Sequence, residues 1–159
     1  MAYTTINKSS EHFNTKLYTG NSIIKARDMA YNHNVMDAVR GSTKRVATDL
    51  TDAESTQAQM IKSFASDGFN LGDNGGVNQD TKTYASWNWK ANGTGSSNTD
   101  GSITSTVSAN TTSGFSIVSY TGNGSAGGST VGHGLNAVPK MFIIKIEVQL
   151  KIGLFIIIQ

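Results

Sequence analysis

The sequence predicts an all-β protein with many turns and little helix. Gly contributes 17 of the 159 residues, while apolar residues reach only 37% and charged residues 15%, the balance being rich in Ser, Thr and Asn. Thr suits a half-buried pleated surface, and Gly and Asn accept the left-handed conformations that turns require. Several short segments also alternate apolar and polar residues, as strands do. Crowding by Thr, Ser and Gly fits long helices poorly.

The N-terminal part predicts short strands. Residues 1–11 are polar and are interpreted as an extended leader. Residues 13–18 alternate as a strand and end in the Thr-Gly-Asn turn at 19–21, and residues 23–25 begin a second strand. Residues 35–39 then lead to a turn at Arg40-Gly41.

The middle of the chain predicts a hairpin. Thr51 and Glu54 have the spacing of a helix capping box, so a short helix through residue 59 and no helix are equally supported. Residues 60–64 and 69–71 flank Asp67-Gly68, a strong hairpin dipeptide. A long polar loop is expected at 70–80.

The second half predicts further strands around a linker. The clearest alternation is at 84–90 (YASWNWK), and residues 91–101 have the composition of a flexible linker. Strands are expected at 103–107, 114–120 and 140–145.

An internal repeat organises the chain. Residues 13–21 (FNTKLYTGN) return as residues 115–123 (FSIVSYTGN), and Ile-Ile-Lys follows each copy. The repeat predicts a first module copy at 1–101 and the truncated beginning of a second copy at 102–159. Only Ser22 separates Asn21 from the triplet in the first copy, whereas residues 124–142 do so in the second, so the first copy is internally shortened after Asn21.

The last residues differ from the rest. From Ile146 the composition changes abruptly to IEVQLKIGLFIIIQ, which has no counterpart in the first copy. We hypothesise that residues 146–159 are an out-of-frame tail, produced by one base lost from a run of A at the codons of Lys145 and Ile146. Resequencing of that run tests the hypothesis.

Charge and composition argue against several function classes. A net charge of +2, with no Lys/Arg run among stacking aromatics, argues against nucleic-acid binding. The chain has no Cys, so disulfides and thiolate metal sites are excluded. No secretory signal is recognisable at the N-terminus. Charges interrupt the apolar residues 141–159, so no membrane insertion is expected.

No motif supports catalysis or a bound cofactor. Residues 122–127 match Gly-x-Gly-x-x-Gly, but the Gly-Ser-Thr residues that follow cannot begin the helix that holds a pyrophosphate, so a loop is predicted. His12, His33 and His133 lack partners at metal-binding spacing, and His133 is interpreted as a loop residue. The sequence therefore predicts no catalytic, cofactor-binding or metal-binding residues, and no ligand-binding residue is assigned.

Acidic and amide side chains also fall in predicted loops. Asp67, Asp73 and Asp80 are expected to satisfy local backbone groups and not to form a pair of catalytic carboxylates. Asp73, Asn74, Asn78 and Asp80 offer oxygens suited to calcium but lack the spacing of a calcium loop, so a plain polar loop is favoured.

Trp87 and Trp89 allow two interpretations. Both share one face of the predicted strand at 84–90 with Ala85. They could form an aromatic platform for sugar rings, or fill the space between two sheets. Core packing is favoured for both.

The chain resembles a repeated module of tail-fibre and related virion proteins of marine bacteriophages. The resemblance rests on residues 1–21, 37–44 (DAVRGSTK), 63–72 (SFASDGFNLG) and 84–90, and on the return from residue 115 to Lys145. It implies an antiparallel jelly-roll β-sandwich, similar to concanavalin A-like lectin domains and incomplete in this chain. The family's loop and strand before the Ile-Lys pair are missing from the first copy.

The resemblance implies a non-enzymatic virion protein, made in the host cytoplasm, that acts as a spacer or adhesion module. Its expected partners are other virion proteins or itself, and host-surface polysaccharide. The polar loops at 70–80 and 122–134 are the expected recognition loops, because loops on a rigid scaffold usually carry contacts. The alternative is a carbohydrate-binding, lectin-like module of a bacterial surface protein, and a glycan depolymerase is a weaker one.

Overall fold

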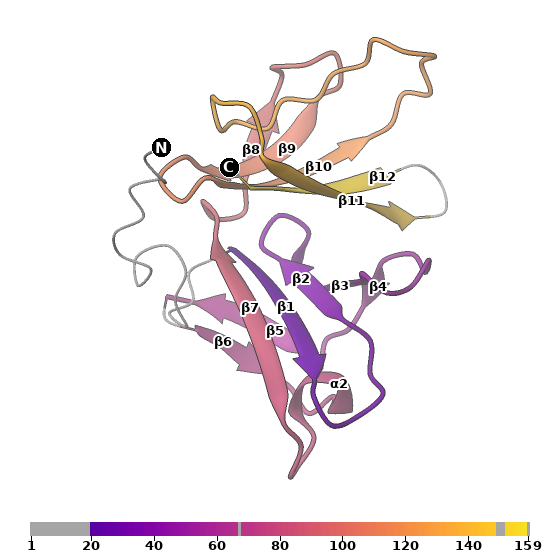
Figure 1. The fold of residues 1–159 in the computed structure, drawn as a ribbon, viewed down its shortest axis with the longest axis vertical. Helices are drawn as coiled ribbons and strands as arrows, with labels where there is room; N and C mark the ends of the chain where they lie inside the picture. Colours follow the sequence, from indigo (N-terminus) through magenta and orange to yellow (C-terminus); the bar gives the residue numbers. More distant parts are fainter. Residues whose placement is uncertain (1–19, 67, 149–151, 159) are drawn as a thin grey trace.

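The computed structural model describes residues 20–66, 68–148 and 152–158, with side chains described up to residue 146. These residues form two five-stranded antiparallel sheets, a two-stranded hairpin and one short helix. Figure 1 shows the two sheets as separate layers, one above the other. The prediction of an all-β, antiparallel sandwich with little helix is confirmed. The strand expected at 13–18 lies outside the described residues.

The first sheet gathers strands from the first half of the chain. Its order is β4-β3-β2-β1-β7, with β7 beside β1 along seven residue pairs from Gly20↔Lys90 to Ala26↔Tyr84. The five strands are β1 (Gly20–Ala26), β2 (Asn34–Asp37), β3 (Gly41–Ala47), β4 (Ser55–Thr56) and β7 (Tyr84–Lys90). The strand predicted at 84–90 is confirmed. A helix through residue 59 does not form, because Ser55 and Thr56 pair with Arg45 and Lys44 of β3 instead.

The second sheet contains strands from the second half of the chain, in the order β11-β12-β10-β9-β8. Its strands are β8 (Ser96–Asn98), β9 (Ser105–Asn110), β10 (Phe115–Thr121), β11 (Met141–Val148) and β12 (Ile152–Ile158). The linker expected at 91–101 is partly wrong, because Ser96–Asn98 pairs with β9. β12 lies between β10 and β11, so residues of the hypothesised out-of-frame tail take part in this sheet. The reading-frame hypothesis itself stays a prediction.

A hairpin and a helical turn cover the outer face of the first sheet. β5 (Ile61–Ala65) pairs with β6 (Gly68–Leu71), which confirms the predicted hairpin. The four-residue helix α2 (Gly75–Asn78) follows inside the expected polar loop, and the Asn74 side chain caps it by accepting from Gly76 N. Residues of both elements pack on Ile24 and Met36 in one cluster that also includes Met60, Ile61, Val77, Phe64, Phe69, Leu71 and Tyr84.

The core between the sheets joins the two halves of the repeat. Val35 and Val46 of the first sheet form one buried cluster with Phe115 and Ile117 of the second. The Trp89 ring stacks on Phe115, with centroids 5.8 Å apart and an angle of 13° between the rings. Strands on either side of the predicted module boundary therefore share one core.

The prediction of core packing is confirmed for Trp89 and wrong for Trp87. The Trp87 side chain is 42% exposed. The two indoles share a face of β7. The chain continues from Lys90, the last residue of β7, to the second sheet, so Trp87 lies two residues farther along β7 from that sheet than Trp89 does. The second sheet therefore covers Trp89 and leaves Trp87 exposed at the surface.

A buried ion-pair network fixes the turn between β2 and β3. The Asp37 carboxylate accepts hydrogen bonds from Val39 N and Arg40 N, each at 2.9 Å, and from Arg40 Nε at 2.7 Å. Arg40 also pairs with Glu54 at 3.1 Å. The side chains of Arg40 and Asp37 are only 3% and 1% exposed. The turn predicted at Arg40-Gly41 is confirmed, and Gly41 adopts the positive φ of 110° that it requires.

Candidate functional site

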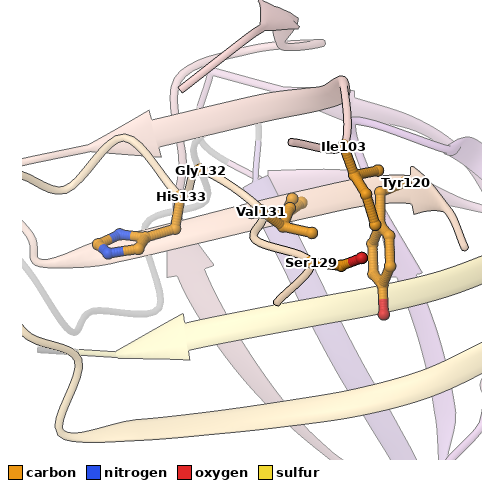
Figure 2. Close-up of a pocket in the computed structure, with 7 residues that line it drawn as sticks. Ile103, Tyr120, Ser129, Val131, Gly132 and His133 are labelled. Carbon is orange, nitrogen blue, oxygen red and sulfur yellow. The ribbon is translucent and has the colours of Figure 1, made fainter. Parts of the chain in front are cut away.

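A cleft lies on the outer face of the second sheet, beneath the long loop between β10 and β11. Its volume is about 360 Å³, and Figure 2 shows most of the residues that line it. The lining residues are Ile103, Val118, Tyr120, Ser129, Val131, Gly132 and His133. A second, shallower hollow of about 490 Å³ shares residues 131–133 with it and continues to Pro139. The two hollows lie on the same stretch of the loop.

Strand alternation places the floor of the cleft. In β10, Phe115 and Ile117 face the other sheet. Side chains of a strand alternate between its two faces, so Val118 and Tyr120 lie together on the opposite, outer face. Val118 packs outward with Val107 and Leu135 in a cluster that includes Ala109 and Val131. Val131 and Leu135 of the loop thus pack on the outer face of the sheet.

Hydrogen bonds fasten the loop above this floor. Thr130 and Ser102 bond reciprocally, Ser102 N donating to Thr130 Oγ1 at 3.0 Å and Thr130 N to Ser102 Oγ at 2.9 Å. Ser116 Oγ donates to the His133 carbonyl at 2.7 Å. Ile103 N donates to Thr130 O at 3.0 Å, and Ile103 pairs with Val131 in an isolated bridge. Both ends of the cleft wall are therefore held to the sheet.

The lining combines aliphatic walls with a few polar groups. Ile103, Val118 and Val131 supply the walls, and Figure 2 shows the Tyr120 ring beside Ile103 with Ser129 near it. Burial raises the pKa of the Tyr120 phenol above its ordinary value, which by itself already keeps the hydroxyl protonated at neutral pH. The His133 Nδ1 accepts from Leu135 N at 3.2 Å, which leaves Nε2 as the donor of the neutral ring. The cleft thus offers hydroxyl and imidazole groups beside an aromatic ring.

One buried hydroxyl near the cleft has no partner among the described residues. Ser105 is only 4% exposed, and its Oγ makes no hydrogen bond to the described part of the chain. Ser105 pairs directly with Tyr120 across β9 and β10, so the two side chains share the outer face of the sheet. An unsatisfied buried hydroxyl costs about 1–3 kcal/mol, which a polar ligand group or a water would recover.

The residues weighed in the sequence lie apart from one another. His33 pairs with Asp49 at 3.4 Å on the first sheet, and His12 lies outside the described residues. His133 lines the cleft, which sequence spacing did not indicate. Within the described chain, no group of three or more His, Asp or Glu side chains is placed to hold a metal ion.

The two predicted recognition loops differ in structure. In the first, Asn74 and Asn78 bond to backbone groups of their own segment, but residues 75–78 form α2 and residues 70–71 belong to β6, so the prediction of a loop throughout 70–80 is wrong there. In the second, residues 122–127 form no helix, so the predicted loop is confirmed there. Its Asn123 Oδ1 accepts from Ser125 N and from Ser129 Oγ, both at 3.0 Å. This second loop lines the cleft described above.

Comparison with known proteins gives one match. A family model described as a domain of unknown function (DUF7483) matches residues 8–153, nearly the whole chain. No curated protein and no solved structure matches. Among the described residues, no helix is long and apolar enough to cross a membrane.

Proposed function

The chain belongs to this family of domains of unknown function, and we propose that it is a non-enzymatic module of a bacteriophage tail fibre or related virion protein that binds host-surface glycan. The observation that carries the proposal is the cleft beneath the loop of residues 122–139. The phage assignment rests on the sequence resemblance, and the glycan assignment rests on the chemistry of the cleft.

The cleft suits a saccharide in size and composition. Small-molecule sites usually measure about 300–1,000 Å³ and combine apolar walls with a few placed polar groups. A sugar ring presents C–H groups on its faces and hydroxyls at its edge. The Tyr120 ring and the aliphatic walls match the faces, and Ser129, His133 and the phenol match the hydroxyls.

The scaffold supports a mechanical role. The two sheets share a buried core, and a further layer packs on the outer face of each. Weak sites repeated along a fibre gain strength through multivalency, so one shallow cleft in each module suffices for adhesion.

The acidic side chains support the non-enzymatic part of the proposal. Asp37 and Glu54 both pair with Arg40, and Asp49 pairs with His33. Asp100, beside the shallower hollow, accepts from Asn98 Nδ2 at 2.9 Å. These carboxylates are engaged with neighbours in the fold, and glycoside hydrolysis requires two that flank the scissile bond.

Replacing Tyr120 with alanine is expected to weaken glycan binding at least about tenfold, or about 1.4 kcal/mol. The substitution removes the aromatic wall and the phenolic hydroxyl together. The measurement is isothermal titration with a ligand selected from an array of bacterial polysaccharides. Tyr120→Phe separates the two contributions, since it keeps the ring and removes only the hydroxyl.

Tyr31→Ala is the matched control, because Tyr31 is an exposed tyrosine in the segment between β1 and β2 of the first sheet. It should leave binding unchanged. If the array shows no ligand, or if Tyr120→Ala binds as well as the original chain, the cleft is not the glycan site. Mass spectrometry of purified phage particles tests the virion assignment separately, and recovery of this family only from bacterial surface fractions would favour the lectin-like alternative.

A further inference from the structure

Exposed apolar side chains concentrate on two strands. Among the described residues, eight large hydrophobic side chains are exposed, and six of them lie on β7 or β11. Those six are Trp87 on β7 and Met141, Phe142, Ile143, Ile144 and Ile146 on β11. Soluble monomers rarely group exposed apolar residues in this way without an interaction to cover them.

The same two strands are the long edges of the two sheets. β7 ends the first sheet and β11 ends the second, and their outer sides pair with no other described strand. β7 has seven residues and β11 has eight, whereas the opposite edges, β4 and β8, have two and three. Short edges resist pairing with other chains, and long apolar edges invite it. Figure 1 shows β7 and β11 at the borders of their sheets.

The internal repeat indicates what is missing beside β11. Ile23-Ile24-Lys25 lies in β1, which pairs with β2 on one side and β7 on the other. Ile143-Ile144-Lys145 lies in β11, which pairs with β12 and has no described strand on its other side. Ile24 is 2% exposed and its equivalent Ile144 is 50% exposed.

The two copies of the triplet also keep the same hairpin partner. Ile23 pairs with Val35, and Ile143 pairs with Ile156, each in the antiparallel strand that follows. β12 therefore occupies the position of β2, and the vacant position beside β11 corresponds to the one that β7 fills beside β1. A strand with the character of β7 is the partner that this edge fits.

We propose that the β11 edge of one molecule pairs with the β7 edge of a second copy of this chain. In a second copy the required strand lies at an edge that no described strand covers, and its Trp87 supplies apolar surface to meet the exposed isoleucines. Strand addition at a sheet edge is a common mode of recognition. Because the two paired edges differ, the contact is heterologous, and it extends head to tail as a fibre does.

Two single substitutions test the pairing. Trp87→Lys places a charge on the β7 edge, and Ile144→Lys places one on the β11 edge, as natural sheets do to prevent edge pairing. The full chain should show stepwise oligomers by size-exclusion chromatography with light scattering. Each variant alone should be monomeric at the same concentration.

Mixing the two variants tests the head-to-tail geometry. Trp87→Lys keeps an intact β11 edge and Ile144→Lys keeps an intact β7 edge, so the equimolar mixture should form a one-to-one dimer and stop there. If β11 paired with itself instead, Trp87→Lys alone would still dimerise and the proposal would be wrong.

Val138→Lys is the control, since Val138 is exposed just before β11 and belongs to neither edge. It should assemble as the original chain does. Circular dichroism melts establish that each variant is folded. A monomeric original chain at all concentrations, irregular aggregates without defined stoichiometry, or a mixture that stays monomeric would each overturn the proposal. Glycan binding by the monomeric variants is measured in parallel, so failure of one proposal is distinguishable from failure of the other.

Discussion

Asp37→Ala is expected to lower the free energy of unfolding by about 3–5 kcal/mol, because it leaves the buried Arg40 guanidinium without its closest partner. Arg40 lies 2.6 Å from Asp37 through Nη2, and both side chains are almost completely buried. Two backbone donors, Val39 N and Arg40 N, lose their acceptor in the same step. Domains of this size are usually stable by about 5–15 kcal/mol, so the variant should lose a large share of its stability.

Urea denaturation monitored by circular dichroism measures this loss. Asp49→Ala is the matched control, because the Asp49 carboxylate contacts His33 at the surface, 3.4 Å from its Nδ1 and 3.1 Å from its backbone N, and exposed pairs contribute about 0–1 kcal/mol. A second test replaces both partners. Asp37→Ala with Arg40→Met should be more stable than Asp37→Ala alone, since the buried guanidinium is removed and Glu54 keeps Lys44 as a partner at 3.7 Å. Equal stability of Asp37→Ala and Asp49→Ala would show that the network does not hold the turn.

Local sequence signals predicted most of the strands. Asp67-Gly68 between two apolar runs predicted the β5–β6 hairpin, and the alternation of YASWNWK predicted β7. These signals are local, because turn residues and side-chain alternation depend on a few neighbouring positions. The capping-box spacing at Thr51 misled for the same reason, since pairing of Ser55 and Thr56 with β3 is a tertiary contact that local propensity does not contain.

The candidate site was predicted only as a loop. The polar segment at 122–134 was expected to carry contacts, but the lining residues Ile103 and Tyr120 come from elsewhere in the chain. Ile103 meets the loop where Ser102 bonds to Thr130 and Ile103 pairs with Val131, and Tyr120 meets it from β10. No spacing rule relates such distant positions, so a single sequence could not assign them.

Local sequence signals also could not predict the ion-pair network of Asp37, Arg40 and Glu54. Asp37 and Arg40 lie within one turn, and a polar turn at this point was predicted. Glu54 joins them because β3 and β4 pair and bring the segment before β4 back to the turn. Burial of all three depends on that pairing, so the sequence alone could not distinguish this network from charges at the surface.

Trp89→Ala is expected to cost about 3–5 kcal/mol of stability, the range usual for removing a large aromatic side chain from a core. The substitution removes the ring that stacks on Phe115 and leaves a cavity between the two sheets, where Val35, Val46 and Ile117 also pack. Chemical denaturation followed by the remaining tryptophan and by circular dichroism measures the loss. Trp87→Ala is the matched control on the same strand and the same face, and it should cost clearly less because that side chain is 42% exposed. If the two variants were equally stable, the second sheet would not pack on the first through Trp89, and the shared core between the two halves of the repeat would have to be abandoned.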